Sequence, residues 1–237
     1  MNINTKHISG FITVPMAIIL GAIIIAIAVI YVSGPKDVAI DDRQVGTANV
    51  LDNLTPLTPT DHIWGNNGAL IKIIEFSDTE CPYCKQFHFT MKKIMEEYGP
   101  TGQVAWIYRH WPIDRHTKAR KESQALECAA ALGGNEKFWS YLDRLFTVTP
   151  SNDQLDLNEL PNIAVYVGLN KYQFEECLNS SQYLDVIDRN SKEALKLGAR
   201  GTPFSVLINS DGQKAVIDGA YPYSSIKQIV ESLLITQ

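Results

Sequence analysis

The amino-acid sequence predicts an α/β domain built from a β-α-β unit, an inserted helical block and a β-β-α unit, preceded by one apolar N-terminal segment. Three features predict this order: an apolar run at 11–32, a β-branched strand that leads into a helix near residue 81, and a return to strand periodicity after Pro203. The chain has 237 residues, of which 45% are hydrophobic and 20% charged. This composition is that of a globular protein and excludes disordered and collagen-like classes.

Residues 11–32 form an apolar run of the length needed to cross a membrane. No Asp, Glu, Lys or Arg occurs between His7 and Pro35, and a helix over this run rises about 33 Å against a hydrocarbon core of about 30 Å. A buried core helix would show a polar face, and a cleaved signal peptide would have a shorter apolar region and a small-residue cleavage site. We therefore expect a short tail at 1–10 and an uncleaved transmembrane anchor at 11–32.

Residues 33–57 contain Gly, Pro, Thr, Asp and Asn with few large apolar side chains. The run Leu54–Pro59 has the alternating Pro pattern of an extended connector. We expect a linker at 33–57, followed by one domain at 58–237 that is long enough to bury its own core.

The first half of the domain begins with a strand at 69–76, which is β-branched and almost continuously apolar, as a central strand buried on both faces should be. A polar turn at 77–80 follows. Residues Cys81–Tyr98 are helical in pattern and end at Gly99-Pro100. Residues 103–108 predict the next strand, which completes β-α-β.

The second half begins with a helical block at about 114–198, which Gly133-Gly134, Thr149-Pro150 and Gly168 divide into shorter helices. After Pro203, Phe204–Asn209 and residues 213–218 form two strands joined by a hairpin turn. An amphipathic helix at 224–234 completes β-β-α.

Cys81-Pro82-Tyr83-Cys84 lies where the first long strand leads into its helix. The first N–H groups of a helix have no partner within it, so a thiolate at Cys81 is stabilised there and its pKa is lowered. Pro82 suits the first turn because its N–H is not needed. Spacing of i, i+3 brings Cys84 to the same face, where it can attack a mixed disulfide on Cys81. We expect Cys81 to be exposed and Cys84 to be more buried.

Structural zinc is the alternative use of this motif, because Cys81, Cys84 and His88 share one helix face. No compact second pair of ligands accompanies them, since Cys128 and Cys177 are far along the chain. Three further histidines have no ligand spacing and are interpreted as surface or strand-end residues: His62, His110 and His116. We predict neither a metal nor a cofactor.

Two further positions are candidates for the site. Glu75 lies near the end of the central strand, and its carboxyl group, if buried, would have a raised pKa and relay a proton to or from Cys84. The alternative is a solvent-facing acid. Thr202-Pro203 precedes a strand, so it is either simple punctuation or a cis bond that faces the cysteines.

These residues resemble the DsbA-like thiol–disulfide oxidoreductases of the thioredoxin superfamily, in particular the membrane-anchored BdbD-like branch. The resemblance covers about residues 58–237. It rests on the following segments: Ile74-Glu75-Phe76-Ser77-Asp78, Cys81-Pro82-Tyr83-Cys84, Arg109-His110-Trp111-Pro112, Ala125–Leu132 with Phe138-Trp139, and Gly201-Thr202-Pro203. It implies a thioredoxin fold in which the helical block is an insertion.

The resemblance also implies residue roles. Cys81 is expected to be the nucleophile, Cys84 the resolving thiol and Glu75 the buried acid. Thr202 and Pro203 are expected to form a cis-Pro loop that pairs with an extended substrate peptide. The Pro82-Tyr83 dipeptide departs from the Pro-His of the strongest oxidants, so no imidazole lies between the cysteines and the potential is expected to be less oxidising.

Cys128 and Cys177 then either pair with each other or remain two buried reduced thiols. We expect a disulfide, which would close a loop of about 50 residues and contribute about 4 kcal/mol in the chain-entropy model. Such a bond also favours an oxidising compartment.

The sequence thus predicts a membrane-anchored protein-disulfide oxidoreductase, with its catalytic domain on the extracytoplasmic face, that oxidises substrate dithiols. The expected partners are cysteine-containing substrate proteins and a membrane redox protein that restores the disulfide. Nucleic acid is not expected, because the net charge is −5 and the basic run at 115–121 is short enough to be a solvated helix face. The alternatives are a reductase or isomerase on the same scaffold, or a redox-inert peptide- or zinc-binding module.

Overall fold

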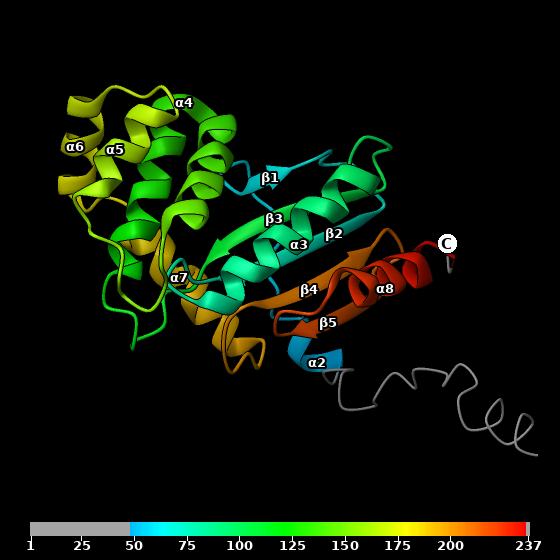
Figure 1. Ribbon diagram of the computed structural model, residues 1–237. Helices are drawn as coiled ribbons and strands as arrows, with labels where there is room; N and C mark the ends of the chain where they lie inside the picture. The colour runs from blue at the N-terminus through cyan, green and yellow to red at the C-terminus, as the bar shows by residue number, and fades with distance from the viewer. Residues whose placement is uncertain (1–47, 236–237) are drawn as a thin grey trace, which may run out of the picture. The chain divides into compact units, whose positions relative to one another are not determined.

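The computed structural model describes residues 48–235. A single five-stranded mixed sheet with the order β1-β3-β2-β4-β5 forms its centre (Figure 1). The strands are β1 (His62–Trp64), β2 (Ile71–Ser77), β3 (Val104–His110), β4 (Phe204–Asn209) and β5 (Lys214–Asp218). Because β2 runs parallel to β3 and antiparallel to β4, it is the central strand that its apolar sequence predicts. The predicted α/β order is confirmed.

Helices cover both faces of this sheet and continue beside it (Figure 1). They are α2 (Ala48–Leu51), α3 (Pro82–Tyr98), α4 (Ala119–Val148), α5 (Glu159–Tyr166), α6 (Lys171–Ser180), α7 (Leu184–Lys196) and α8 (Tyr223–Ile235). One apolar cluster joins α3, α8 and the helical insertion to one face of the sheet, through residues such as Phe87, Phe138 and Val230. A second cluster packs Leu51 and Leu197 on the opposite face.

Helix α4 is bent at Gly134, which has φ 76° and ψ −173°. The open space around this glycine would hold a Cβ, so its positive φ is what disfavours other residues there. The predicted break at Gly133-Gly134 is confirmed, because the backbone is non-helical at Gly134 and a helical segment lies on each side of it. The helical insertion then continues through α5, α6 and α7.

The basic run at 115–121 is partly solvated, with Arg115 exposed and the Arg120 side chain 42% exposed, and it also contacts neighbouring segments. Lys118 Nζ donates to the carbonyl of Leu155 at 2.7 Å, and Arg120 pairs with Asp188 at 2.6 Å. These contacts leave no pattern in the sequence because their partners lie far along the chain.

Two segments differ from the sequence-based expectation. Strand β1 was not predicted, because three residues are too few to show alternation, and it forms the sheet edge by antiparallel pairing with β3. Residues 48–57, which were assigned to the linker, pack on the domain. Leu51 is 3% exposed, and the backbone N–H and hydroxyl of Thr55 donate to Glu193 at 2.6 and 2.8 Å.

The predicted tail at 1–10, the predicted anchor at 11–32 and most of the predicted linker lie outside the described residues. Within residues 48–235, none of the helices combines the length and the apolar character that a membrane crossing requires. The anchor therefore stays a prediction from the sequence.

Candidate active site

Cys81 and Cys84 occupy the first turn of α3, directly after the loop that leaves β2. Cys81 is the N-cap residue with extended backbone angles (φ −80°, ψ 122°), and Pro82 begins the helix. Both cysteines are free thiols and both side chains are fully buried. The expectation that Cys81 is exposed is therefore wrong in this structure, because the loop that contains Thr202 lies over it: the Thr202 carbonyl oxygen is 3.4 Å from Cys81 Sγ.

The two thiols ionise very differently. A hydrogen bond from the Cys84 thiol is the largest cause that lowers the pKa of Cys81, to about 5, and contacts with Thr202 and the backbone N–H groups of Tyr83 and Cys84 add to it against the effect of burial. Burial raises the pKa of Cys84 well above its ordinary value, and the neighbouring Cys81 raises it further. At neutral pH the reduced pair is thus a Cys81 thiolate beside a Cys84 thiol, which is the ionisation that a nucleophile and its partner need.

The loop from residue 201 to 203 faces this pair from the other half of the chain. The bond between Thr202 and Pro203 is cis, and Pro203 leads directly into β4. Since β4 pairs with β2, the sheet itself brings the loop to the start of α3.

Glu75 is fully buried in the central strand. Trp106 Nε1 donates to its Oε2 at 2.8 Å. Burial raises the pKa of Glu75 to about 7, and Coulomb repulsion from Cys81 contributes, although hydrogen bonds from Ser77 and Trp106 oppose the rise. The alternative of a solvent-facing acid is therefore wrong, and the carboxyl group can give or take a proton near neutral pH.

A second group of buried acids lies in the loop before Cys81, where the sequence predicts only a polar turn. Asp78 accepts hydrogen bonds from the backbone N–H groups of Glu80 and Ile113, both at 2.8 Å, and burial raises its pKa to about 6. Its own N–H donates to Cys84 Sγ at 3.4 Å. Short polar runs between a strand and a helix are usually solvent-exposed turns, so the sequence held no signal of this burial.

Glu122 of α4 belongs to the same acidic surroundings. Burial and the neighbouring Glu80 raise the pKa of Glu122 to about 9. It is therefore a neutral carboxylic acid at pH 7, so the buried cluster holds less negative charge than its composition suggests.

Cys128 and Cys177 form a disulfide that joins α4 to α6 within the helical insertion, with Cα atoms 5.8 Å apart. It is separate from the Cys81–Cys84 pair. The four cysteines are therefore divided into one bonded pair in the insertion and one free pair at the start of α3.

Of the three histidines interpreted as surface or strand-end residues, His62 begins β1 and His110 ends β3, so these two are strand-end residues, but all three are buried. His62, His110 and His116 are 8%, 0% and 6% exposed. His116 Nδ1 lies 3.0 Å from Asp78, and His62 and His110 both contact Glu127. Pairing of β1 with β3 brings 62 and 110 together, which no spacing in the sequence could reveal.

His88 does not complete a zinc site with the two cysteines. Its ring is buried, and its Nε2 contacts Asp143 at 3.2 Å. Within residues 48–235, the group of three metal-ligand side chains that does come together is His62, His110 and Glu127.

A sheet of this order, with a low-pKa cysteine at a helix start beside a buried partner thiol, is the arrangement of the thioredoxin fold. A family model described as "Thioredoxin" matches residues 57–232, and the chain belongs to this family. Within the thioredoxin superfamily it is DsbA-like, as comparison with solved structures shows.

Three solved structures show the similarity. The chain is similar to α-DsbA1 of Wolbachia pipientis, with 26% identity and a TM-score of 0.66 over 77% of this chain and 94% of that one. For DsbA2 of Pseudomonas aeruginosa the values are 25% identity, a TM-score of 0.62, and 75% and 97% coverage. Oxidised BdbD of Bacillus subtilis shares the fold at 23% identity, with a TM-score of 0.63 and 73% and 92% coverage.

Curated relatives by sequence carry a different description. The Na(+)/H(+) antiporter NhaA 1 of Mycolicibacterium gilvum is 27% identical over 171 residues, which are 70% of this chain and 26% of that protein. The corresponding antiporter of Mycolicibacterium vanbaalenii is 28% identical over the same length. The chain thus spans about a quarter of the length of the curated relatives it matches.

Proposed function

We propose that this chain is a protein-disulfide oxidoreductase that oxidises substrate dithiols through Cys81 and Cys84. The observation that carries the proposal is the opposite ionisation of the two thiols, with a stabilised Cys81 thiolate beside a buried Cys84 thiol. A stabilised thiolate favours the reduced form of the pair, and a pair with a stable reduced form is a strong oxidant.

The reaction begins from the Cys81–Cys84 disulfide. A substrate thiolate attacks Cys81 Sγ, the bond between Cys81 and Cys84 breaks, and Cys84 leaves and takes up a proton. The second substrate thiolate then attacks the substrate sulfur of the mixed disulfide, and Cys81 leaves as a thiolate. The substrate dithiol is oxidised to a disulfide by two electrons, and the Cys81–Cys84 pair is reduced by the same two.

Glu75 is proposed to supply the proton that Cys84 needs as it leaves. Its pKa of about 7 keeps a part of the population protonated at neutral pH, and its charge acts on Cys84. Thr202 and Pro203 are proposed to receive the substrate backbone, since Thr202 is already in contact with Cys81.

The cellular setting is part of the proposal. The apolar run at 11–32 would anchor the domain in a membrane, on the extracytoplasmic side. The Cys128–Cys177 disulfide supports an oxidising compartment for the domain. A membrane redox protein would reoxidise the Cys81–Cys84 pair after each turnover.

A disulfide reductase or isomerase is the second candidate. The Pro82-Tyr83 dipeptide favours it, because no imidazole lies between the cysteines to stabilise the thiolate further. The same scaffold at a lower potential would donate electrons instead of accepting them.

The reduction potential of the full chain, equilibrated against glutathione, separates the two candidates. A value near or above about −150 mV is expected and would identify a donor of disulfides, whereas a value near about −270 mV, like that of thioredoxin, would identify a reductase. A count of free thiols after oxidation should fall by two; an unchanged count would overturn both candidates.

A further inference from the structure

Three potential metal ligands from three different elements meet at the edge of the sheet, apart from the cysteine pair. His62 begins β1, His110 ends β3, and Glu127 belongs to α4. Both imidazole rings direct Nε2 to the same carboxylate oxygen, Glu127 Oε1, at 3.0 Å for His62 and 2.8 Å for His110. His62, His110 and Glu127 are 8%, 0% and 8% exposed. The arrangement is therefore held by packing and is not a chance contact of mobile side chains.

Packing fixes these ligands where they are. The His62 ring stacks on Phe138 with centroids 3.6 Å apart, and the His110 ring lies edge-on to Tyr108 at 5.4 Å. Because packing already holds these side chains in place, little conformational entropy is lost when they bind an ion.

The two contacts to Glu127 suit a small tetrahedral ion. Zinc bonds of about 2.0–2.1 Å place neighbouring ligand atoms roughly 3.3 Å apart, and Glu127 Oε1 lies 3.0 and 2.8 Å from the two imidazole nitrogens. All three ligand atoms lie within 4.8 Å of one another. An ion would be admitted by outward shifts of a few tenths of an ångström at these two contacts, with the two imidazole nitrogens brought to the same spacing from each other. Imidazole nitrogen with one carboxylate is a donor set that suits zinc better than calcium or magnesium, which prefer oxygen.

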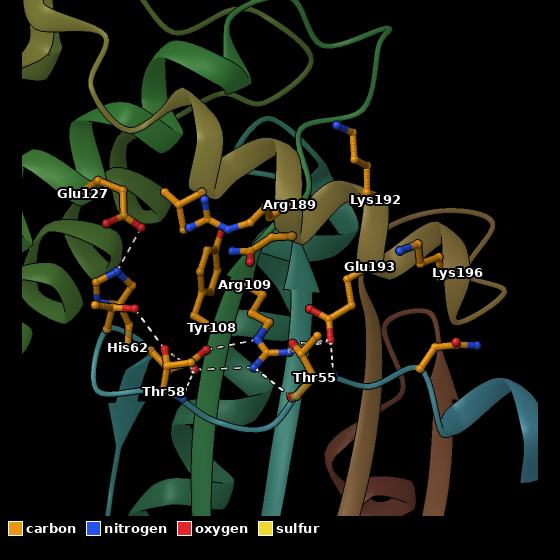
Figure 2. A pocket seen from close by; sticks show the side chains of 15 residues that line it. Thr55, Thr58, His62, Tyr108, Arg109, Glu127, Arg189, Lys192, Glu193 and Lys196 are labelled. Atoms are coloured by element: carbon orange, nitrogen blue, oxygen red, sulfur yellow. Dashed lines mark hydrogen bonds and ion pairs between the residues drawn. The ribbon is translucent and has the colours of Figure 1, made fainter.

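An open cavity provides the route to this cluster. Its volume is about 430 Å³, and His62 and Glu127 line it together with Tyr108 and Arg109 (Figure 2). His110 is fully buried and is not among the residues that line the cavity. A water from the cavity can therefore complete the coordination from one direction only, as in a three-ligand zinc site with an open position.

The positive charges around the cavity do not prevent cation binding. The guanidinium of Arg109 is already paired with Asp61 at 3.0 Å and with Glu193 at 2.7 Å. The remaining cations that line the cavity are exposed to solvent, which screens their charge: Arg189, Lys192 and Lys196.

We propose that His62, His110 and Glu127 bind one zinc ion, which fastens the three-residue edge strand β1 to β3 and α4. The proposal is independent of the redox function, because neither Cys81 nor Cys84 contributes a ligand. It also differs from the zinc site considered from the sequence, which required both cysteines and His88.

The test uses the full, untagged chain with both cysteine pairs oxidised, so that no thiolate competes for the metal. Titration with Zn²⁺, followed by calorimetry, should show one ion bound per chain. Glu127→Gln keeps the side-chain shape but removes the charge, and we expect it to weaken binding by at least 10-fold. Asp143→Asn is the matched control, because it removes a carboxylate that contacts the single buried imidazole of His88; its zinc affinity should equal that of the wild type.

A second measurement needs no variant and stays valid if Glu127→Gln fails to fold. Co²⁺ added to the oxidised wild type should give the visible absorption of a four-coordinate nitrogen and oxygen site, and Zn²⁺ should abolish it and raise the thermal midpoint. A wild type that binds no Zn²⁺, or a folded Glu127→Gln variant that binds it as tightly as Asp143→Asn, would overturn the proposal.

Discussion

Two sulfur atoms three residues apart are placed in opposite electrostatic environments by one helix start. Cys81, at the N-cap of α3, receives hydrogen bonds that stabilise its negative charge. Cys84, one turn into the helix, is buried and faces the charge of Cys81, so its proton is retained. The division of labour between nucleophile and resolving thiol follows from position along the helix and not from residue type.

Substitution of each cysteine should therefore have a different result. Cys81→Ser is expected to abolish turnover, because the Cys81–Cys84 disulfide that the substrate attacks can no longer form. Cys84→Ser should accumulate mixed disulfides when it meets a disulfide-bonded protein: the Cys81 thiolate attacks that disulfide, one substrate sulfur leaves as a thiolate, and no Cys84 thiol is present to displace the other. Non-reducing gel electrophoresis after incubation with a disulfide-bonded protein substrate distinguishes the two. Normal turnover in Cys81→Ser would contradict the assignment of the nucleophile.

Glu75→Gln tests the buried acid. Glutamine keeps an oxygen that can accept from Trp106 but has no proton to exchange, so turnover should fall and its pH profile should lose the step near pH 7 that the pKa of Glu75 predicts. A structural role alone would lower activity without changing the shape of the profile.

Glu75→Gln, which should lower turnover, should raise the stability of the fold at alkaline pH. The pKa of Glu75 is raised from 4.5 to about 7 on folding, so the folded state binds more protons than the unfolded state in this window and stability falls as pH rises through it. Above pH 7 the loss corresponds to roughly 3 kcal/mol. Glu75→Gln should therefore be more stable than the wild type at pH 8 and not at pH 4, as urea unfolding at the two values would show.

Helices and strands are predicted correctly where the pattern that indicates them lies within the segment itself. The β-branched run of β2 and the Pro-x-Cys start of α3 are local patterns, and both elements are where the sequence places them to within two residues. Strand β1 and the burial of Asp78 and His110 depend on partners that lie elsewhere in the sequence, as when Asp78 accepts from the N–H of Ile113, 35 residues further on. Such contacts leave no periodicity in the sequence, so they were missed.

The helical insertion depends on a covalent link between α4 and α6. Cys128 and Cys177 are separated by 49 residues, and closing a loop of that size in the unfolded chain corresponds to about 4 kcal/mol. Replacing both with Ala should lower the free energy of unfolding by about that amount while the Cys81–Cys84 potential stays unchanged. Denaturant unfolding and redox titration of the double variant measure the two effects separately. A shifted potential in the folded variant would place this disulfide on the electron path.

At the scale of the whole molecule, the site is assembled from both ends of the domain. Cys81 and Thr202 are 121 residues apart in the sequence and 3.4 Å apart in space, because β4 pairs with the strand that leads into α3. The helical insertion lies between Cys81 and Thr202 in the sequence, but it does not separate them in space. Because the groups around Cys81 come from both halves of the domain, ionisation of Cys81 should change the stability of the whole domain.

This coupling predicts a pH-dependent stability of the reduced chain. Folding lowers the pKa of Cys81 from 9.0 to about 5, so between these values the unfolded state binds more protons than the folded state and stability rises with pH. It is lost again as the pH falls through 5. The effect of Glu75 has the opposite sign between pH 4.5 and 7. Comparison with Cys81→Ser subtracts the part of it that burial causes, because that variant keeps Glu75 buried and loses only the contribution of Cys81 to its pKa.

The stability of the reduced wild type, measured relative to reduced Cys81→Ser by urea unfolding, should therefore increase from pH 5 to pH 8 by about 4 kcal/mol at most. The oxidised wild type has no thiolate to stabilise and should lack this increase. Since whatever stabilises the reduced fold over the oxidised one makes the disulfide a stronger oxidant, the same pH series predicts the direction of electron flow. Equal pH slopes for the wild type and Cys81→Ser would show that the thiolate is not stabilised by the fold, and the case for an oxidant would fail with it.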